Sequence, residues 1–258
     1  MDLKQYALVT GASSGIGECF IRALARRGHN VVAAARSKEK LEGLAHEMQS
    51  RHGIEAVPLP IDLSEIGAAH RLVQMLRERQ IQINLLINNA GFGAQGQVWE
   101  LPLDRLIGML HLNIQALLEL SALLIPQMLE NRAGGIINVS STASFQPLPF
   151  TSVYAATKAF VTSFSLALAE ELRPYHVKVV TLCPGTTRTR FFEAGGYKSL
   201  RFRARFQAPE KVVEAGLRAL DQGGGLMLPG WIDRCIVFAE RFLPRSWLVR
   251  GAAGMFKP

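Results

Sequence analysis

A short apolar run followed at once by three closely spaced glycines constrains the fold of this chain more than any other feature. Residues 5–10 (QYALVT) lack polar alternation, which predicts a strand buried on both faces, as in a parallel sheet. Residues 11–17 (GASSGIG) follow, and a helical pattern then extends from Glu18 to Arg27. A strand, a glycine-rich turn and a helix in this order predict the first unit of an alternating α/β fold.

The same alternation of short apolar runs and helical segments continues along the chain. We expect further strands at 30–35, 56–61, 83–87, 136–140, 178–182 and 225–228. We expect helices at 38–51, 64–78, 155–172 and 209–220, and two helices broken near Asn113, of which the second spans 114–130. No linker or repeat interrupts this pattern, so residues 1–258 are predicted to form one α/β domain.

Cysteine usage and hydropathy predict a cytoplasmic protein. Cys19, Cys183 and Cys235 are odd in number and lack metal-ligand spacing, so neither a disulfide framework nor a metal site is expected. We expect no leader peptide and no transmembrane helix. The net charge of +8 fits nucleic acid, an acidic membrane surface or anionic small molecules, and equally a basic protein with no such partner. No nucleic-acid partner is expected, because no binding motif accompanies the basic residues.

The glycine-rich turn at 11–17 is a candidate nucleotide site. Backbone N–H groups at the start of the helix after the first strand are suited to bind a pyrophosphate. The spacing differs from the G-x-G-x-x-G fingerprint, because three residues separate the first two glycines. A tight connection without a ligand is the alternative, and the position after the first strand favours the nucleotide.

The end of the second strand indicates the type of nicotinamide cofactor. In dinucleotide-binding folds an acidic side chain near this point binds the ribose of NAD, whereas an arginine accommodates the 2′-phosphate of NADP. Here the strand ends in Ala35 and Arg36 follows. We therefore expect NADP(H) rather than NAD(H); the alternative is an arginine that only faces solvent.

Small and amide side chains follow the fourth predicted strand, where residues 88–91 read NNAG. At the carboxyl ends of parallel strands such residues predict a ligand crevice. Asn88 and Asn89 could equally cap the loop. The strand at 136–140 delivers Ser141 to the same edge of the predicted sheet.

Tyr154 and Lys158 lie four residues apart where a helix is expected to begin, so they project from one face. A lysine cation within a few ångströms favours the phenolate and lowers the tyrosine pKa from its ordinary value of about 10. Such a tyrosine can act as an acid–base catalyst. A chance pair on a solvated helix is the alternative.

Together these residues resemble the short-chain dehydrogenase/reductase family over residues 5 to about 230. The matching segments are TGASSGIG (10–17), Asp62-Leu63, NNAG (88–91), Asn113, Ser141, Tyr154-x-x-x-Lys158 and Pro184-Gly185 with Thr189. The resemblance implies a Rossmann-like, doubly wound parallel sheet with helices on both faces. It is closest to NADP(H)-preferring, bacterial-type members whose substrates are unassigned.

The resemblance also implies a role for each position. Tyr154 would be the general acid, with Lys158 lowering its pKa and bonding the nicotinamide ribose. Ser141 would polarise the substrate carbonyl; it is chosen over Ser140 because the family serine lies thirteen residues before the tyrosine. Asn113 would position a water that links Lys158 to solvent. The expected cofactor-binding residues are Gly11, Ser13, Ser14, Ile16, Gly17, Arg36, Asp62, Leu63, Asn89, Ala90, Gly91, Tyr154, Lys158, Pro184, Gly185, Thr187 and Thr189. Thr187 departs from the pattern, because many members have an apolar residue there.

Two segments are expected to determine substrate and partner choice. Residues 188–207, a predicted lid, carry one acid, Glu193, and six basic side chains: Arg188, Arg190, Lys198, Arg201, Arg203 and Arg205. They fit an anionic or thioester-linked substrate, or a mobile solvated lid. Residues 231–258 interleave aromatic side chains with arginines. For this amphipathic extension we favour packing within a homodimer or homotetramer over covering a substrate channel or contacting an acidic membrane.

The predicted function is hydride transfer between NADPH and a small-molecule carbonyl or alcohol, a ketone or a 3-oxoacyl group. A non-catalytic NADP(H)-binding sensor or regulatory protein is the alternative. The set of Asn113, Ser141, Tyr154 and Lys158 favours the enzyme, since a protein that only binds the cofactor needs no proton donor.

Overall fold

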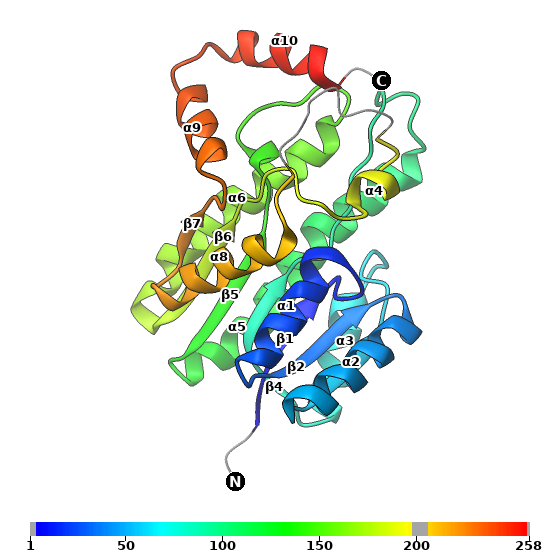
Figure 1. Cartoon of the computed structure of the whole chain (residues 1–258), viewed down its shortest axis with the longest axis vertical. Coiled ribbons are helices and arrows are strands. Elements are labelled where there is room, and N and C mark those ends of the chain that lie inside the picture. Colours follow the sequence, from blue (N-terminus) through cyan, green and yellow to red (C-terminus); the bar gives the residue numbers. More distant parts are fainter. Residues whose placement is uncertain (1–3, 198–205, 257–258) are drawn as a thin grey trace.

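The computed structural model describes residues 4–197 and 206–256, and seven parallel strands form its centre (Figure 1). The strands are β1 Gln5–Thr10, β2 Asn30–Ala35, β3 Ala56–Pro60, β4 Gln82–Asn88, β5 Gly134–Val139, β6 Val177–Leu182 and β7 Gly225–Met227. Their order in the sheet is β3-β2-β1-β4-β5-β6-β7. The order reverses between β1 and β4, which is where open α/β sheets bind ligands.

Helices connect successive strands. They are α1 Gly15–Arg26, α2 Lys38–His52, α3 Ala68–Glu78, α4 Leu103–Leu110, α5 Ala116–Glu130, α6 Ser152–Leu172, α7 Phe191–Ala194, α8 Pro209–Asp221, α9 Trp231–Glu240 and α10 Arg245–Phe256. Short helical turns are η1 His111–Gln115, η2 Thr142–Ser144 and η3 Arg173–Tyr175. Helices α1 to α6 and α8 follow the predicted alternation. Helices α9 and α10 form the C-terminal extension at the end of the molecule opposite the N-terminus (Figure 1).

Both faces of the sheet are buried. Helices α1, α2 and α8 cover one face, where Ala7 and Val9 of β1 join their core cluster. Helices α3, α5 and α6 cover the other face, where Tyr6 and Leu8 join a second cluster. Alternate residues of one apolar strand thus enter different cores, which confirms the expectation for residues 5–10 and the doubly wound fold.

Two stretches, Leu103–Glu130 and Ser152–Tyr175, are long and apolar enough to cross a membrane by length and composition. The same properties characterise core helices of soluble proteins. In this structure α5 and α6 pack on the sheet and contribute Leu120, Leu124, Leu168 and Leu172 to the second core cluster. We therefore assign both stretches to the core.

Helices α1 and α6 begin three residues before their predicted starts, at Gly15 and Ser152. Two other predictions, at Ser64 and at Asn113, were wrong. The helix expected from Ser64 begins at Ala68, because Asp62 Oδ1 accepts hydrogen bonds from the backbone and hydroxyl of Ser64 and Gly67 adopts a left-handed conformation with φ of 76°. The expected break near Asn113 is a π-helical turn, η1, which joins α4 to α5 without interruption.

Candidate active site

A cavity of about 1370 Å³ lies at the carboxyl ends of the strands. It extends from the glycine-rich turn and Arg36 to α9 and α10, where Trp231 and Phe256 line it. Every residue that we expected to contact cofactor or substrate lines this cavity, except Gly17 and Asn113. The expected ligand crevice is therefore a continuous space in the structure.

The glycine-rich turn brings α1 close to the sheet. Gly11 and Gly15 have positive φ angles of 65° and 59°, a conformation that favours glycine. A Cβ added to Gly17 would lie 2.2 Å from the carbonyl oxygen of Gly11, and one added to Gly11 would lie 2.9 Å from Ala90 Cα. Gly17 thus allows α1 to approach the backbone of Gly11 closely. Ser14 and Ile16 at the start of α1 line the cavity. This cradle fits a pyrophosphate.

Thr10 and the two asparagines hold the ends of β1, β4 and β5 together. Thr10 Oγ1 accepts hydrogen bonds of 3.0 Å from the backbone N–H groups of Asn89 and Ala90, and Asn89 Nδ2 donates to Thr10 O at 2.8 Å. Asn88 Nδ2 donates to Asn138 Oδ1 at 2.9 Å. Asn88 and the amide of Asn89 therefore stabilise the loop, as the capping alternative predicts. The sequence comparison included Thr10 in the matching segment but assigned it no role.

Arg36 is available to bind an anion. Its side chain is 79% exposed at the cavity rim, and Nη1 lies 3.8 Å from Asp62 Oδ2. Burial raises the pKa of Asp62, but hydrogen bonds from Ser64 and the charge of Arg36 outweigh burial and lower it. Arg36 makes no closer ion pair among the described residues, so the residue fits a 2′-phosphate.

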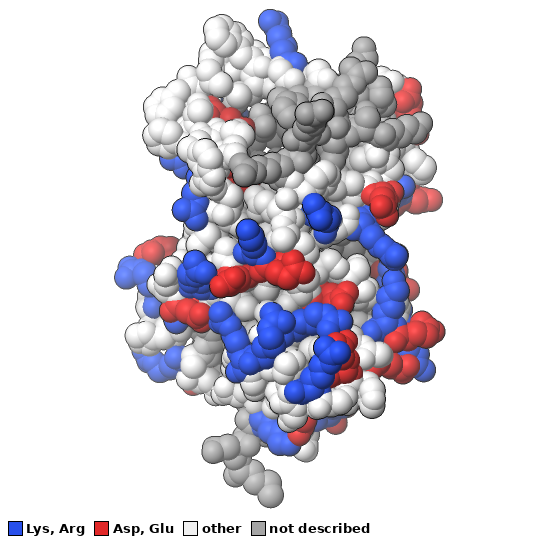
Figure 2. All heavy atoms as spheres, in the orientation of Figure 1, with Lys and Arg blue, Asp and Glu red and all other residues white. Residues whose placement is uncertain are grey.

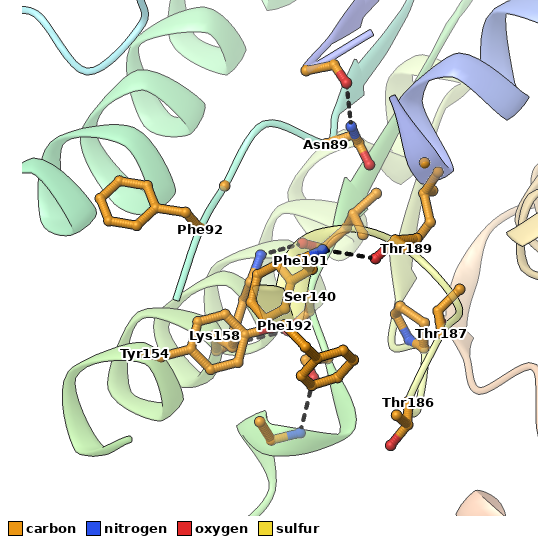
Figure 3. A pocket seen from close by; sticks show the side chains of 18 of the residues that line it. Asn89, Phe92, Ser140, Tyr154, Lys158, Thr186, Thr187, Thr189, Phe191 and Phe192 are labelled. Carbon is orange, nitrogen blue, oxygen red and sulfur yellow. Dashed lines mark hydrogen bonds between the residues drawn. The ribbon is translucent and has the colours of Figure 1, made fainter. Parts of the chain in front are cut away.

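Tyr154 and Lys158 extend from α6 into the same space, with Phe191 beside them (Figure 3). Lys158 Nζ donates to the carbonyl oxygen of Val139 at 2.8 Å and lies 5.9 Å from the centre of the Tyr154 ring. Burial lowers the pKa of Lys158 from 10.5 to about 8. Burial raises the pKa of Tyr154 from 10.0 to about 12, and the Ser141 hydroxyl offsets part of this rise. The expected lowering by Lys158 is absent here, because its ammonium is directed at Val139.

Ser140 and Ser141 point in different directions. Ser140 Oγ donates to the carbonyl oxygen of Lys158 at 2.9 Å and lies 2.7 Å from Thr162 Oγ1, so it is bound to α6. Ser141 Oγ accepts a 3.1 Å hydrogen bond from the N–H of Ala143 and interacts with Tyr154. This arrangement favours Ser141 for substrate contact, and that role stays a prediction.

Asn113 acts away from the cavity surface. Its Oδ1 accepts from the N–H of Phe92 at 3.1 Å, and its Nδ2 donates to Phe92 O at 3.0 Å and to Thr157 Oγ1 at 3.1 Å. A Cβ added to neighbouring Gly91 would lie 3.0 Å from Asn113 Oδ1 and 3.6 Å from Lys158 Nζ. The side chain thus positions the segment that borders Lys158.

Aromatic side chains form a wall of the cavity beside Tyr154, and sequence reasoning missed them. Phe191, Phe192, Tyr197 and Phe206 line the cavity. The ring centres of Tyr154 and Phe191 are 5.2 Å apart, and those of Phe191 and Tyr197 are 6.1 Å apart. Their density in residues 191–206 is a signal in the sequence, whereas the prediction for this segment rests only on its basic side chains.

The basic side chains of the predicted lid are only partly within the described residues. Arg188 and Arg190 are exposed, and Arg190 borders the cavity. Lys198, Arg201, Arg203 and Arg205 lie outside the described residues. The anionic-substrate hypothesis therefore stays a prediction.

Asp233 joins the C-terminal extension to the loop after β6. Its carboxylate accepts a hydrogen bond from Gln207 Nε2, and Gln207 pairs through its backbone with Thr186 and Arg188. A Cβ added to Gly185 would lie 2.6 Å from Asp233 Oδ2. Burial raises the pKa of this carboxyl group. In the part of the chain that the structure describes, no group of three His, Cys, Asp or Glu residues could hold a metal ion.

The nucleotide cradle lies where the strand order of the parallel sheet reverses, and a tyrosine, a lysine and a serine share its cavity. This combination is typical of the class of dinucleotide-dependent oxidoreductases. The family model described as short chain dehydrogenase matches residues 5–196, and the chain belongs to this family. It is an oxidoreductase of the short-chain dehydrogenase/reductase type.

Three relatives illustrate the similarity. A very-long-chain 3-oxoacyl-CoA reductase from Anas platyrhynchos is 34% identical over 192 residues, which are 73% of this chain and only 61% of that protein. A short-chain dehydrogenase from Sphingobium yanoikuyae in complex with NADPH is 31% identical with a TM-score of 0.83, covering 95% of this chain and 94% of the other. The bulky-bulky ketone specific alcohol dehydrogenase from Comamonas testosteroni is 28% identical with a TM-score of 0.78, covering 95% and 97%.

Proposed function

We propose that this protein is an NADP(H)-dependent oxidoreductase that reduces the carbonyl group of a bulky apolar substrate, with Tyr154 as the proton donor. The observation that carries this proposal is that Tyr154, Ser141 and Lys158 line the same cavity as the glycine-rich cradle and Arg36. When bound, the cofactor supplies the hydride. The protein supplies orientation, a proton and a polarising environment.

The protonation states of the site suit reduction. With a pKa of about 12, Tyr154 is neutral at pH 7 and carries the proton that a carbonyl oxygen requires. The Ser141 hydroxyl donates a hydrogen bond to the same oxygen. Lys158, with a pKa of about 8, is mostly charged at pH 7 and adds a positive charge to the site.

The cradle and Arg36 support NADP(H) as the cofactor. The glycines permit the close approach of a pyrophosphate, and the exposed guanidinium is suited to a phosphate. The NADPH complex of the Sphingobium relative supports the same assignment.

The aromatic wall supports a bulky apolar substrate. Four aromatic residues between 191 and 206 border the space next to Tyr154. An apolar wall binds the apolar part of a substrate and does not select for particular polar groups. The named activities of the Comamonas and Anas relatives concern a bulky ketone and a 3-oxoacyl group. We include both classes in the proposal.

A carbonyl screen with matched tyrosine variants tests the proposal. NADPH consumption is measured against ketones and 3-oxoacyl thioesters of increasing size. Tyr154→Phe should lower turnover at least about 100-fold while NADPH still binds, because it removes only the proton donor. Tyr175→Phe, which changes an exposed tyrosine, should leave turnover unchanged. Turnover that persists in Tyr154→Phe would show that another group donates the proton.

The proposal includes a cytoplasmic location and a homodimer or homotetramer. Leu118 of α5 and Leu166 of α6 are large apolar residues exposed on helices that otherwise pack on the sheet. These residues are suitable for a subunit contact. Light scattering of the Leu118→Glu, Leu166→Glu variant should then give a smaller mass than the unmodified protein.

A further inference from the structure

The C-terminal extension exposes an unusual number of large apolar side chains. Phe238 is 62% exposed, Phe242 73% and Trp247 65%, and Leu243 between them is also exposed. The rings of Phe238 and Phe242 contact each other, with centres 5.3 Å apart. We call these four residues the C-terminal apolar face. None of them lines the cavity, so catalysis in the cavity does not explain them.

Arginines accompany this face, and the acids of the same segment are directed elsewhere. Arg241, Arg245 and Arg250 are exposed and form no ion pair with any described residue. Asp233 and Glu240, the two acids between 231 and 256, both line the cavity. The outer surface of the extension is therefore apolar and positively charged.

The rest of the surface differs from this end. In Figure 2 the end formed by α9 and α10 is mostly white with few blue or red side chains, whereas blue and red side chains crowd the surface over α1, α2 and α8. Several basic side chains in the main body have acidic partners, as in the pairs of Arg22 with Glu18 and Glu47. The extension thus combines four exposed large apolar side chains with three arginines that form no ion pair with a described residue.

We propose that the C-terminal apolar face docks on an anionic lipid surface. Exposed Phe and Trp side chains insert at the boundary of headgroups and acyl chains, while arginines bind lipid phosphates. A second copy of the chain fits less well. A two-fold contact places the same patch on both partners, and here it would bring unpaired arginines together without an exposed acid from this segment to neutralise them.

Docking in this way directs the cavity toward the membrane. Trp231 and Ile236 of α9 line the cavity and are also exposed, so they lie at its mouth. Phe238 of the C-terminal apolar face lies on the same helix as these two residues, and the rest of the face follows that helix in the chain. An apolar substrate dissolved in the lipid would then reach the cavity without crossing water. This consequence rests on the proposed function, whereas the docking proposal does not rest on it.

Vesicle flotation of the full chain tests the proposal. The probes are phosphatidylcholine vesicles with and without phosphatidylglycerol. We expect binding to the anionic vesicles, a blue shift of tryptophan fluorescence on binding, and weakening by high salt. Replacing Arg241, Arg245 and Arg250 by Gln should weaken binding about 100-fold, at about fivefold for each charge. NADPH titration of this variant verifies folding independently of activity.

A charge-matched control and a second variant make the result decisive. Replacing Arg77, Arg79 and Arg132 by Gln removes three exposed arginines that form no ion pair with a described residue, near the amino ends of β4 and β5, and should leave flotation unchanged. Replacing Phe238, Phe242 and Trp247 by Ser should abolish flotation. Equal loss in both arginine variants, or no flotation of the unmodified chain, would overturn the proposal. A third outcome would also overturn the proposal: the unmodified chain forms an oligomer and binds no vesicles, and the serine variant is a monomer. That result would assign the face to a contact with a second copy.

Discussion

Replacing Lys158 by Met should stabilise the fold at neutral pH while it removes the charge from the site. Lys158 is 6% exposed, and burial lowers its pKa from 10.5 to about 8. A difference of this size corresponds to about 3 kcal/mol of destabilisation of the folded state at pH 7. Loss of the 2.8 Å hydrogen bond to Val139 O costs about 1 kcal/mol. Met has a similar length and no charge, so we expect a net gain of about 2 kcal/mol.

The pH dependence of this gain follows from the same shift. Below pH 8 the lysine is charged in both states, so the penalty is complete. Between pH 8 and 10.5 the unfolded chain binds more protons than the folded one, and the unmodified protein gains stability as pH rises. The advantage of Lys158→Met should therefore disappear near pH 10. Tyr154 acts in the opposite direction above pH 10, since its pKa is raised, but it is present in both proteins.

Urea unfolding followed by circular dichroism at pH 7 and pH 10 measures both effects. Lys178→Met is the matched control, because Lys178 is exposed, and its effect should stay within about 0.5 kcal/mol. If Lys158→Met were less stable than the unmodified protein at pH 7, or if its advantage did not change with pH, burial would not be destabilising the Lys158 ammonium.

Four other substitutions separate the parts of the site. Arg36→Ala should weaken NADPH binding about 10- to 100-fold and leave NADH binding unchanged, as measured by fluorescence titration with Arg51→Ala as control. Gly17→Ala should lower the free energy of unfolding by about 2 kcal/mol or more, because its Cβ would lie 2.2 Å from Gly11 O; a neutral result in urea unfolding would mean that the turn can move. Ser141→Ala should reduce turnover about 100-fold with little change in stability, whereas Ser140→Ala should lower stability by about 1 to 2 kcal/mol, because Ser140 bonds α6.

The fold could be predicted because the apolar runs are short and regularly spaced. β1 and β2 have the predicted bounds, and the other strands differ by at most two residues at an end. Parallel strands buried on both faces leave this pattern directly in the sequence. The start of α3 was predicted wrongly, since Ser64 and Glu65 resemble a helix N-terminus while Gly67 delays the helix.

The composition of the site could be predicted, but its electrostatics could not. The motif residues identified Tyr154 and Lys158, yet their protonation depends on burial and on the Val139 carbonyl oxygen. Four-residue spacing fixes only that two side chains share a helix face. It does not fix where a flexible lysine directs its ammonium.

Asn113 shows how the fold changes the interpretation of a motif residue. Its side-chain amide makes three hydrogen bonds, to both backbone groups of Phe92 and to Thr157. That leaves its side chain little capacity to bind a water. The residue lies in a π-helical turn, where the regular helical pairing of carbonyl oxygens is interrupted. The water stays a prediction, and it would have to bind a backbone oxygen of this turn. The side chain of Asn113 holds the turn against the segment that borders Lys158.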